Sequence, residues 1–210
     1  MCKLKAVVFD YGKVISFPPD KGAWDEIAAL AGLKWEDMEF PYKKHRGDFD
    51  RGRLNSSGFY RAILDDLNCK IDEKILKQMG ELDLKSWINI NPETVRLMED
   101  VKNAGLILAV LSNMPSDFLK FVRTIPVLSL PHVGIYSCET GSIKPEEAIY
   151  LKLLSETGCR SEELVFFDDV PENVSKALDL GIEARIWQDC EKARRDLYDL
   201  GLLEPLAKLG

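Results

Sequence analysis

Short apolar runs alternate with longer amphipathic segments along most of the chain. The runs have the length and the β-branched and aromatic content of strands that are buried on both faces of a parallel sheet. Five of them occupy residues 4–10, 106–112, 133–137, 164–168 and 183–187. From residue 91 onward, helical and strand-like segments alternate regularly. This order predicts an α/β fold with a doubly wound, parallel, five-stranded Rossmann-like core.

Turn-forming residues bracket the predicted helices. Residues 91–93 provide a capping asparagine, a proline at the first helical position and an acid in the first turn. Helices are expected to start in the same way at residues 114–116 and 144–147, and a last amphipathic helix is expected at residues 190–200. Glycines that suit the left-handed end of a helix stand at Gly105, Gly158 and Gly181.

The segment between residues 17 and 89 differs, because it contains no strand-like run. Apolar residues recur there at helical spacing, as in Trp24, Ile27, Ala28 and Ala31 or in Tyr60, Ile63, Leu64 and Leu67. The segment predicts a helical cap domain inserted after the first strand, with hinges at residues 17–20 and 84–90. The core then comprises residues 1–16 and 90–210, and the cap comprises residues 17–89.

Composition and charge exclude several classes of protein. The chain has 210 residues, of which 46% are apolar and 30% are charged, as in ordinary globular proteins. Its net charge of −7 and its lack of a basic stripe argue against a nucleic-acid partner. No window of about 18 apolar residues predicts a membrane span. A small anionic substrate is still compatible, because a local cationic pocket can form in an acidic protein.

The cysteines indicate free thiols. Their number is odd, none forms a CxxC pair, and they are scattered at Cys2, Cys69, Cys138, Cys159 and Cys190. We therefore expect a reducing, cytoplasmic location. The two histidines, His45 and His132, stand in no motif, so a cysteine–histidine enzyme is not expected, and His132 is expected in a loop. The oligomeric state is left open between a monomer and a homodimer.

Polar residues follow several of the predicted strands. Ligands of open α/β sheets bind at the carboxyl ends of the strands, where such residues would meet. They are Asp10 after the first strand, Ser112 and Asn113 after the second, Lys144 in the loop after the third, and Asp168 and Asp169 after the fourth. Each alone would be an ordinary cap, turn or surface residue. Their joint placement predicts a functional site.

These residue types fit the transfer of a group from an anionic ester. A carboxylate such as Asp10 can form a covalent aspartyl-phosphate. Paired acids beside it are costly unless a cation lies among them, and Mg²⁺ prefers such oxygen ligands. Lys144 would neutralise charge on Asp10 and on a phosphoryl group, while the Ser112 hydroxyl would hold phosphoryl oxygens.

Four stretches that contain these residues resemble the motifs of the haloacid dehalogenase-like (HAD) hydrolase superfamily. VVFDYGKV resembles its first motif, LSN its second, GSIKPEEAIY its third and LVFFDDVPENVSKA its fourth. The order agrees, and the resemblance covers essentially the whole chain. The helical insert lies where members with a helical cap carry theirs. The chain is thus similar to the epoxide-hydrolase-N-terminal-like and sugar phosphatase-like subgroup.

The resemblance implies a phosphatase mechanism. Asp10 would attack phosphorus, and water would then hydrolyse the aspartyl-phosphate formed from a small phosphorylated metabolite, such as a sugar phosphate. Ser112 and Lys144 would hold the phosphoryl group and the nucleophile, and Asn173 would order the loop after the fourth motif. The implied ligands of Mg²⁺ are Asp10, the main-chain carbonyl of Gly12, Asp168 and Asp169.

Gly12 departs from the common pattern, because most family phosphatases have an aspartate here as general acid and base. Glycine keeps a carbonyl for the metal and tolerates a sharp turn, but it has no proton to offer. Loss of general acid–base catalysis lowers the reaction rate roughly 10²–10⁴-fold, and the rate falls most for substrates with poor leaving groups. A subgroup with the pattern FDxGxV includes sugar phosphatases. We therefore expect a leaving group that departs easily, such as an acyl or anomeric oxygen.

Two other functions compete with a phosphatase. The 2-haloacid dehalogenases of the superfamily also lack that aspartate and need no metal, but their fourth motif resembles Ser-x-Asn followed by a single Asp. The pair Asp168-Asp169 argues against this class. The other alternative is a catalytically weak or silent protein that binds a phosphorylated ligand or a partner. Such a protein has no need to keep all four polar strand ends.

The predicted cap is expected to cover the site and to choose the substrate. Its run at residues 42–53 is rich in basic residues, and Arg46 is our first choice for contact with an anionic or hydroxyl-rich substrate. Lys13 and Phe17, just after the first motif, are placed to face the cap. We predict that Asn113, Lys13 and Arg46 bind the substrate.

Overall fold

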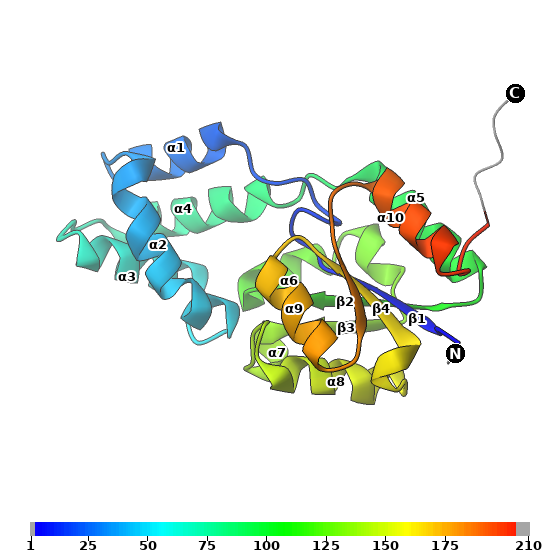
Figure 1. The fold of residues 1–210 in the computed structure, drawn as a ribbon. Coiled ribbons are helices and arrows are strands. Elements are labelled where there is room, and N and C mark those ends of the chain that lie inside the picture. The colour runs from blue at the N-terminus through cyan, green and yellow to red at the C-terminus, as the bar shows by residue number, and fades with distance from the viewer. Residues whose placement is uncertain (1–2, 205–210) are drawn as a thin grey trace, which may run out of the picture.

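A sheet of five parallel strands forms the centre of the core (Figure 1). The structure, a computed structural model, describes residues 3–204. The strands are β1 (Ala6–Phe9), β2 (Ile107–Ser112), β3 (Val133–Tyr136), β4 (Leu164–Asp168) and β5 (Glu183–Ile186). Their spatial order is β3-β2-β1-β4-β5, and each neighbouring pair is parallel. The predicted doubly wound, five-stranded core is confirmed, and the strand order reverses at β1.

Helices cover both faces of the sheet, because successive strand residues point to opposite sides. The core helices are α5 (Pro92–Asn103), α6 (Ser116–Val122), α7 (Ser137–Thr140), α8 (Glu147–Thr157), α9 (Pro171–Asp179) and α10 (Cys190–Asp199), with 3-10 helices at Pro126–Ser129 and Ser161–Glu163. Val7 and Phe9 pack in one hydrophobic cluster with α5, α6 and α10. Ala6 and Val8 pack in a second cluster with α8 and α9. Burial on both faces explains why β1 is a continuous apolar run.

Four helices between β1 and α5 form a separate group beside the core (Figure 1). They are α1 (Lys21–Ala29), α2 (Trp35–Asp50), α3 (Ser56–Asp66) and α4 (Glu73–Ser86). Aromatic rings join the first three: Trp24 of α1 stacks on Trp35 of α2 at 4.7 Å between ring centroids, and Phe49 of α2 stacks on Phe59 of α3 at 4.3 Å. We keep the name cap for residues 17–89, whose exact boundaries remain a prediction.

The two connections between cap and core run beside each other. Ser16 and Ile90 form an antiparallel bridge. The N–H of Phe17 donates to the carbonyl of Asn89 at 2.7 Å. Farther along α2, the Ser137 hydroxyl of the core donates to the main-chain carbonyl of Asp50 at 2.5 Å. The cap is therefore tied to the core at its connections and at the end of α2.

The helix starts that the sequence predicts agree with the structure in part. Asn91 caps α5 through its side chain and Pro92 is its first residue, as expected. Pro115 and Glu146, in contrast, are the residues that precede α6 and α8, so the expected proline at the first helical position is wrong for both helices. The helix-ending glycines have left-handed backbones, with φ of 78° at Gly105, 64° at Gly158 and 80° at Gly181.

Within residues 3–204, no helix is long and apolar enough to cross a membrane. The cysteines that the structure describes, Cys69, Cys138, Cys159 and Cys190, are free thiols, and Cys2 lies outside the described residues. The cytoplasmic location and the choice between monomer and homodimer remain predictions.

Candidate active site

Asp10 directly follows β1, in the middle of the sheet. Its N–H extends the sheet by donating to the carbonyl of Phe167 at 3.0 Å. The chain then turns tightly, because the carbonyl of Tyr11 accepts hydrogen bonds from the N–H groups of Ile15 and Ser16, both at 2.9 Å. This turn leaves Asp10 at the point where the strand order reverses, which is where open α/β sheets bind ligands.

Lys144 joins Asp10 to Asp168. Its Nζ lies 2.8 Å from Asp10 Oδ1 and donates to Asp168 Oδ2 at 2.6 Å and to the carbonyl of Leu111 at 2.9 Å. The Lys144 side chain is only 1% exposed, so its ammonium group is enclosed among these three oxygens. The structure thus brings together the first, third and fourth of the motif residues that the sequence singled out.

Asp168 is held by the loop that follows β4. Its Oδ1 accepts from the N–H of Val170 at 2.8 Å, and the Asn173 amide donates to Oδ1 at 3.0 Å and to Oδ2 at 3.1 Å. The Tyr150 hydroxyl in turn donates to the carbonyl of Asn173 at 2.9 Å. Asn173 was expected to order this loop, and it also fixes the carboxylate directly.

Three carboxylates gather at the end of β1 and β4. Asp10, Asp168 and Asp169 each offer an oxygen, and these oxygens lie within 4.8 Å of one another. Burial raises the pKa of Asp10 to about 6; Lys144 opposes this rise, and the charge of Asp168 adds to it. Three carboxylates thus face two ammonium groups, those of Lys144 and of the half-exposed Lys13, so one negative charge is left over when all of them are ionised. A hard cation with oxygen ligands, such as Mg²⁺, fits this donor set, and the carbonyl of Gly12 is the further ligand that the motif predicts.

Two predicted substrate-binding residues, Asn113 and Lys13, form hydrogen bonds with other residues of the site. The Asn113 side chain accepts from the N–H of Lys144 at 2.7 Å and donates to its carbonyl at 3.0 Å. It therefore positions the main chain of Lys144. Lys13, which has a left-handed backbone with φ of 61°, donates to Asp169 Oδ2 at 3.0 Å and is half exposed. Substrate contact by either residue remains a prediction.

A cavity of about 180 Å³ opens above Asp10. Of the nine predicted site residues, seven line it, while Lys144 and Asp168 lie behind Asp10. The seven are Asp10, Gly12, Lys13, Arg46, Ser112, Asn113 and Asp169. Residues that the sequence did not single out complete the lining: Tyr11, Asp50, Trp87, Met114, Pro115, Phe118 and Val170. The cavity therefore has a polar floor and a largely apolar wall, and α2 and the end of α4 contribute to it.

Arg46 reaches the cavity as part of an ion pair. Its Nε donates to both carboxylate oxygens of Asp50, at 2.9 and 3.0 Å, and its terminal nitrogen donates to the Tyr42 hydroxyl at 2.6 Å. Asp50 stands one helical turn after Arg46, a spacing at which opposite charges pair and which could have revealed it in the sequence. The cap thus presents a neutralised pair to the cavity, and substrate binding by Arg46 remains a prediction.

Gly12 lies against the side chain of Trp87. The left-handed residue of this turn is Lys13, and Gly12 is absent from the described glycines with positive φ. A Cβ atom at Gly12 would instead lie 3.2 Å from Cζ3 of Trp87, which is closer than an ordinary van der Waals contact. The backbone at position 12 therefore does not need the left-handed conformation that glycine tolerates best.

Behind Trp87 lies a buried acid, Asp83, which is fully enclosed within the cap. Burial raises its pKa to about 6, and the nearby guanidinium of Arg46 opposes this rise while Asp50 adds to it. The Tyr60 hydroxyl and the Trp87 indole N–H face the carboxylate without reaching good hydrogen-bond geometry. An ionised Asp83 is therefore incompletely solvated by its surroundings.

Asp83→Asn is expected to stabilise the protein at pH 8 more than at pH 4. The pKa of Asp83 is raised in the folded state, so the native state binds this proton more tightly than the unfolded state does. As pH rises through about 6, Asp83 ionises and the native protein loses stability relative to the Asn variant. The difference in unfolding free energy should reach the order of 3 kcal/mol above pH 7 and fade below pH 4. Urea unfolding at several pH values measures it. Asp65→Asn, at an exposed position of α3, is the control, and equal profiles for both variants would contradict the expectation.

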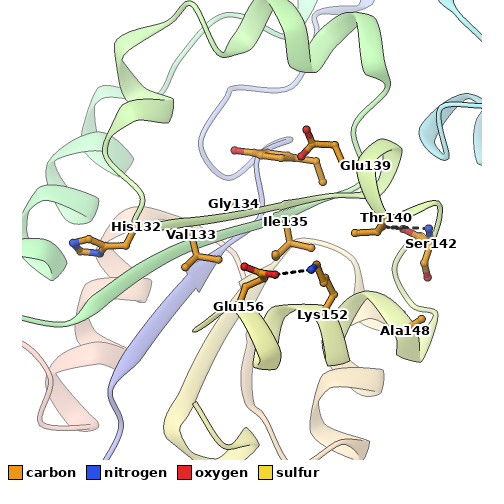
Figure 2. Close-up of a pocket in the computed structure, with 11 residues that line it drawn as sticks. His132, Val133, Gly134, Ile135, Glu139, Thr140, Ser142, Ala148, Lys152 and Glu156 are labelled. Carbon is orange, nitrogen blue, oxygen red and sulfur yellow. Dashed lines mark hydrogen bonds and ion pairs between the residues drawn. The ribbon is translucent and has the colours of Figure 1, made fainter. Parts of the chain in front are cut away.

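A larger cavity of about 590 Å³ lies along the edge strand β3 (Figure 2). Figure 2 shows Lys152 and Glu156 of α8 paired with each other there, at 2.5 Å. His132, at the other end, is a loop residue as expected, and its Nδ1 accepts from the N–H of Leu108 at 3.0 Å. This cavity contains none of the nine predicted site residues, so size alone does not identify the functional site.

Comparison with known families decides the classification. A model of the haloacid dehalogenase-like hydrolases matches residues 4–181. The chain belongs to this family. This match, together with the five-stranded parallel sheet, confirms the family that the four motifs predicted.

Several individual proteins resemble this HAD-like chain. A phosphatase of Mycobacterium tuberculosis (strain CDC 1551 / Oshkosh) is 24% identical over 215 residues, which cover 95% of this chain and 96% of the relative. Flavin mononucleotide hydrolase 1 of the Arabidopsis thaliana chloroplast is 32% identical over 73 residues, 35% of this chain, and the match spans only 30% of that protein. A HAD family enzyme of Bacteroides thetaiotaomicron, solved in complex with magnesium and inorganic phosphate, aligns with a TM-score of 0.72 at 19% identity over 88% of this chain and 94% of the enzyme. At this identity the structural likeness shows the shared fold alone.

Proposed function

We propose that this HAD-like hydrolase is a Mg²⁺-dependent phosphatase that acts on a small phosphate ester or acyl phosphate. The observation that carries the proposal is the group of Asp10, Asp168 and Asp169 around one point, with Lys144 bridging the first two. The names of two relatives, a phosphatase and a flavin mononucleotide hydrolase, and the solved complex with magnesium and phosphate support the same reaction class.

The chemistry proceeds in two displacements. A carboxylate oxygen of Asp10 forms a bond to phosphorus while the bond from phosphorus to the ester oxygen breaks, and the leaving group takes that electron pair. Water then attacks phosphorus in the aspartyl-phosphate, and the bond from phosphorus to the Asp10 oxygen breaks. Asp10 and inorganic phosphate are released, and the attacking water gives its proton to solvent. Bound Mg²⁺ would supply positive charge beside the phosphoryl oxygens. Lys144 holds Asp10 in place, and the hydroxyl of Ser112 donates to the phosphoryl group.

The missing side chain at Gly12 restricts the leaving group. Without an acid at this position, an alkoxide would depart unprotonated, which is slow. Because acid–base help is worth roughly 10²–10⁴-fold, esters with acidic leaving groups should be hydrolysed much faster than alkyl phosphates. Acyl, aryl and anomeric phosphates are therefore the proposed substrate class, and sugar 1-phosphates are the metabolites of that class to test first.

A substrate panel tests this function. Acetyl phosphate, p-nitrophenyl phosphate, glucose 1-phosphate and glycerol phosphate are assayed for phosphate release with Mg²⁺, with a chelator, and with Asp10→Asn as the background. Turnover above that background, dependent on metal and fastest for the acidic leaving groups, is expected. Chloride release from 2-chloropropionate without metal would instead identify a dehalogenase. No turnover of any compound would favour the silent binding protein.

Mg²⁺ is expected to raise the melting temperature of the protein in the absence of substrate. At a concentration of 100 times its dissociation constant, a ligand stabilises the native state by about 2.7 kcal/mol, which corresponds to roughly 5–10 °C for a chain of this size. Asp169→Asn should reduce this shift because it removes one of the three carboxylates. Asp179→Asn, at an exposed position of α9, is the matched control. An equal shift in all three proteins would place the ion elsewhere.

A further inference from the structure

Trp87 stands where the cap meets the turn that carries Asp10. It follows the last residue of α4, and its carbonyl accepts a hydrogen bond from the Tyr11 hydroxyl at 3.1 Å. Its indole N–H is buried and faces Asp83 inside the cap. The core therefore contacts the main chain of Trp87, and the cap surrounds the polar edge of its ring. The indole itself lies at the boundary between cap and core, where it lines the cavity above Asp10.

The six-membered part of the indole lies against Gly12. A Cβ atom at Gly12 would meet three ring atoms, Cζ3 at 3.2 Å, Cε3 at 3.8 Å and Cη2 at 3.9 Å. The ring thus takes up the space into which a side chain at position 12 would extend. Glycine at this position and tryptophan at position 87 are complementary in size, because protein interiors leave little room for an added atom.

The same ring forms part of the wall of the cavity above Asp10. Trp87 lines it together with Met114 and Phe118, which come from the core. The cavity measures about 180 Å³, whereas sites for drug-sized ligands measure about 300–1,000 Å³. An ester that places its phosphoryl group beside Asp10 has its leaving group confined by this wall.

We propose that Trp87 is a specificity-determining residue that limits this enzyme to compact leaving groups. The proposal rests on the proposed phosphatase function and adds the size of the substrate to it. Trp87 replaces the missing side chain at position 12 sterically, while it contributes no acid to the reaction. Its indole N–H is the only polar atom of the side chain, and that atom faces Asp83.

Trp87→Ala should therefore widen the range of leaving groups. We expect the ratio of kcat/KM for 1-naphthyl phosphate to that for acetyl phosphate to rise at least about 10-fold over the native protein, because a change of pocket volume is worth at least that much in discrimination. Trp87→Phe, which keeps an aromatic wall, should give a smaller rise. Trp35→Ala is the control, since Trp35 stacks on Trp24 within the cap and does not line the cavity. An unchanged ratio in Trp87→Ala, or an equal rise in Trp35→Ala, overturns the proposal.

Binding provides a readout that does not need turnover. In the presence of Mg²⁺, calorimetry with methylphosphonate and 1-naphthylphosphonate should show that Trp87→Ala gains at least about 10-fold in preference for the larger ligand. If the native enzyme hydrolyses phosphate esters but this preference is unchanged, the proposal for Trp87 fails and the phosphatase function stands. If no phosphate ester is hydrolysed and neither phosphonate binds to either protein, both proposals fail together.

The complementarity with Gly12 is tested by stability. Gly12→Ala should lower the melting temperature of the native protein by about 2–4 °C, because the ring must move away from the new methyl group. In the Trp87→Ala background the same substitution should cause no loss. Equal losses in the two backgrounds would show that Gly12 and Trp87 are not coupled, and would overturn the steric basis of the proposal.

Discussion

Replacing Asp10 with asparagine is expected to lower kcat at least about 10³-fold on every phosphate ester that the native protein hydrolyses. The amide has nearly the shape of the carboxylate but is a poor nucleophile, so no aspartyl-phosphate forms. Lys144, which lies 2.8 Å from Asp10, keeps its bonds to Asp168 and Leu111. The fold should therefore survive, and removal of one charge from three clustered carboxylates should leave the melting temperature unchanged or raised.

Steady-state phosphate release with Mg²⁺ measures this effect, and a melting curve on the same preparation shows that the variant is folded. Asp179→Asn makes the same chemical change at an exposed position of α9 and should retain native kcat. Retention of more than a tenth of native activity by folded Asp10→Asn would mean that Asp10 is not the nucleophile, and the proposed covalent route would have to be abandoned.

Replacing Lys144 with methionine should give the second large effect, on stability as well as on activity. The ammonium is buried between Asp10 and Asp168, and its loss leaves two buried carboxylates without their shared cation. Removing one partner of a buried ion pair costs about 3–5 kcal/mol. The unfolding free energy in metal-free solution should fall by that amount. Activity should also fall, because Asp10 loses the contact that positions it.

Urea unfolding in the presence of a chelator measures the loss, and Lys152→Met is the matched control. Lys152 forms an exposed pair with Glu156 one turn along α8, and such pairs contribute at most about 1 kcal/mol. Mg²⁺ should restore part of the stability lost in Lys144→Met, because a cation among the carboxylates replaces some of the missing positive charge. A loss no larger than in Lys152→Met would contradict the structural role assigned to Lys144.

Much of the site could be predicted from local sequence, because most of its residues directly follow predicted strands. Asp10, Ser112 and Asp168 each stand at the carboxyl end of an apolar run, and parallel strands bring those ends together whatever the loops do. Lys144 follows the third strand only after a loop, so its place in the site depended on its position after that strand together with the other polar strand ends. Its ion pairs with Asp10 and Asp168 are seen only in the tertiary structure, and they agree with the role assigned to it.

Two predicted substrate-binding residues have partners in the structure that the sequence analysis did not name, and their contact with substrate stays a prediction. Asn113 was expected to face the substrate, yet its amide is used by the main chain of Lys144. Arg46 is predicted to contact an anionic or hydroxyl-rich substrate, and in the structure its Nε donates to Asp50 and one terminal nitrogen donates to Tyr42. A sequence lists these donors and acceptors but does not state which of them pair.

By itself, the sequence determined the parallel α/β core, the HAD-like motifs and the acids at the strand ends, because burial on both faces of a strand and the polarity at its end are local properties of the chain. Only the tertiary structure showed what lies against position 12. The residue that fills its space, Trp87, comes from the end of the fourth cap helix, and no spacing or periodicity relates it to the first motif. Steric complementarity between them exists only once the cap is packed against the core.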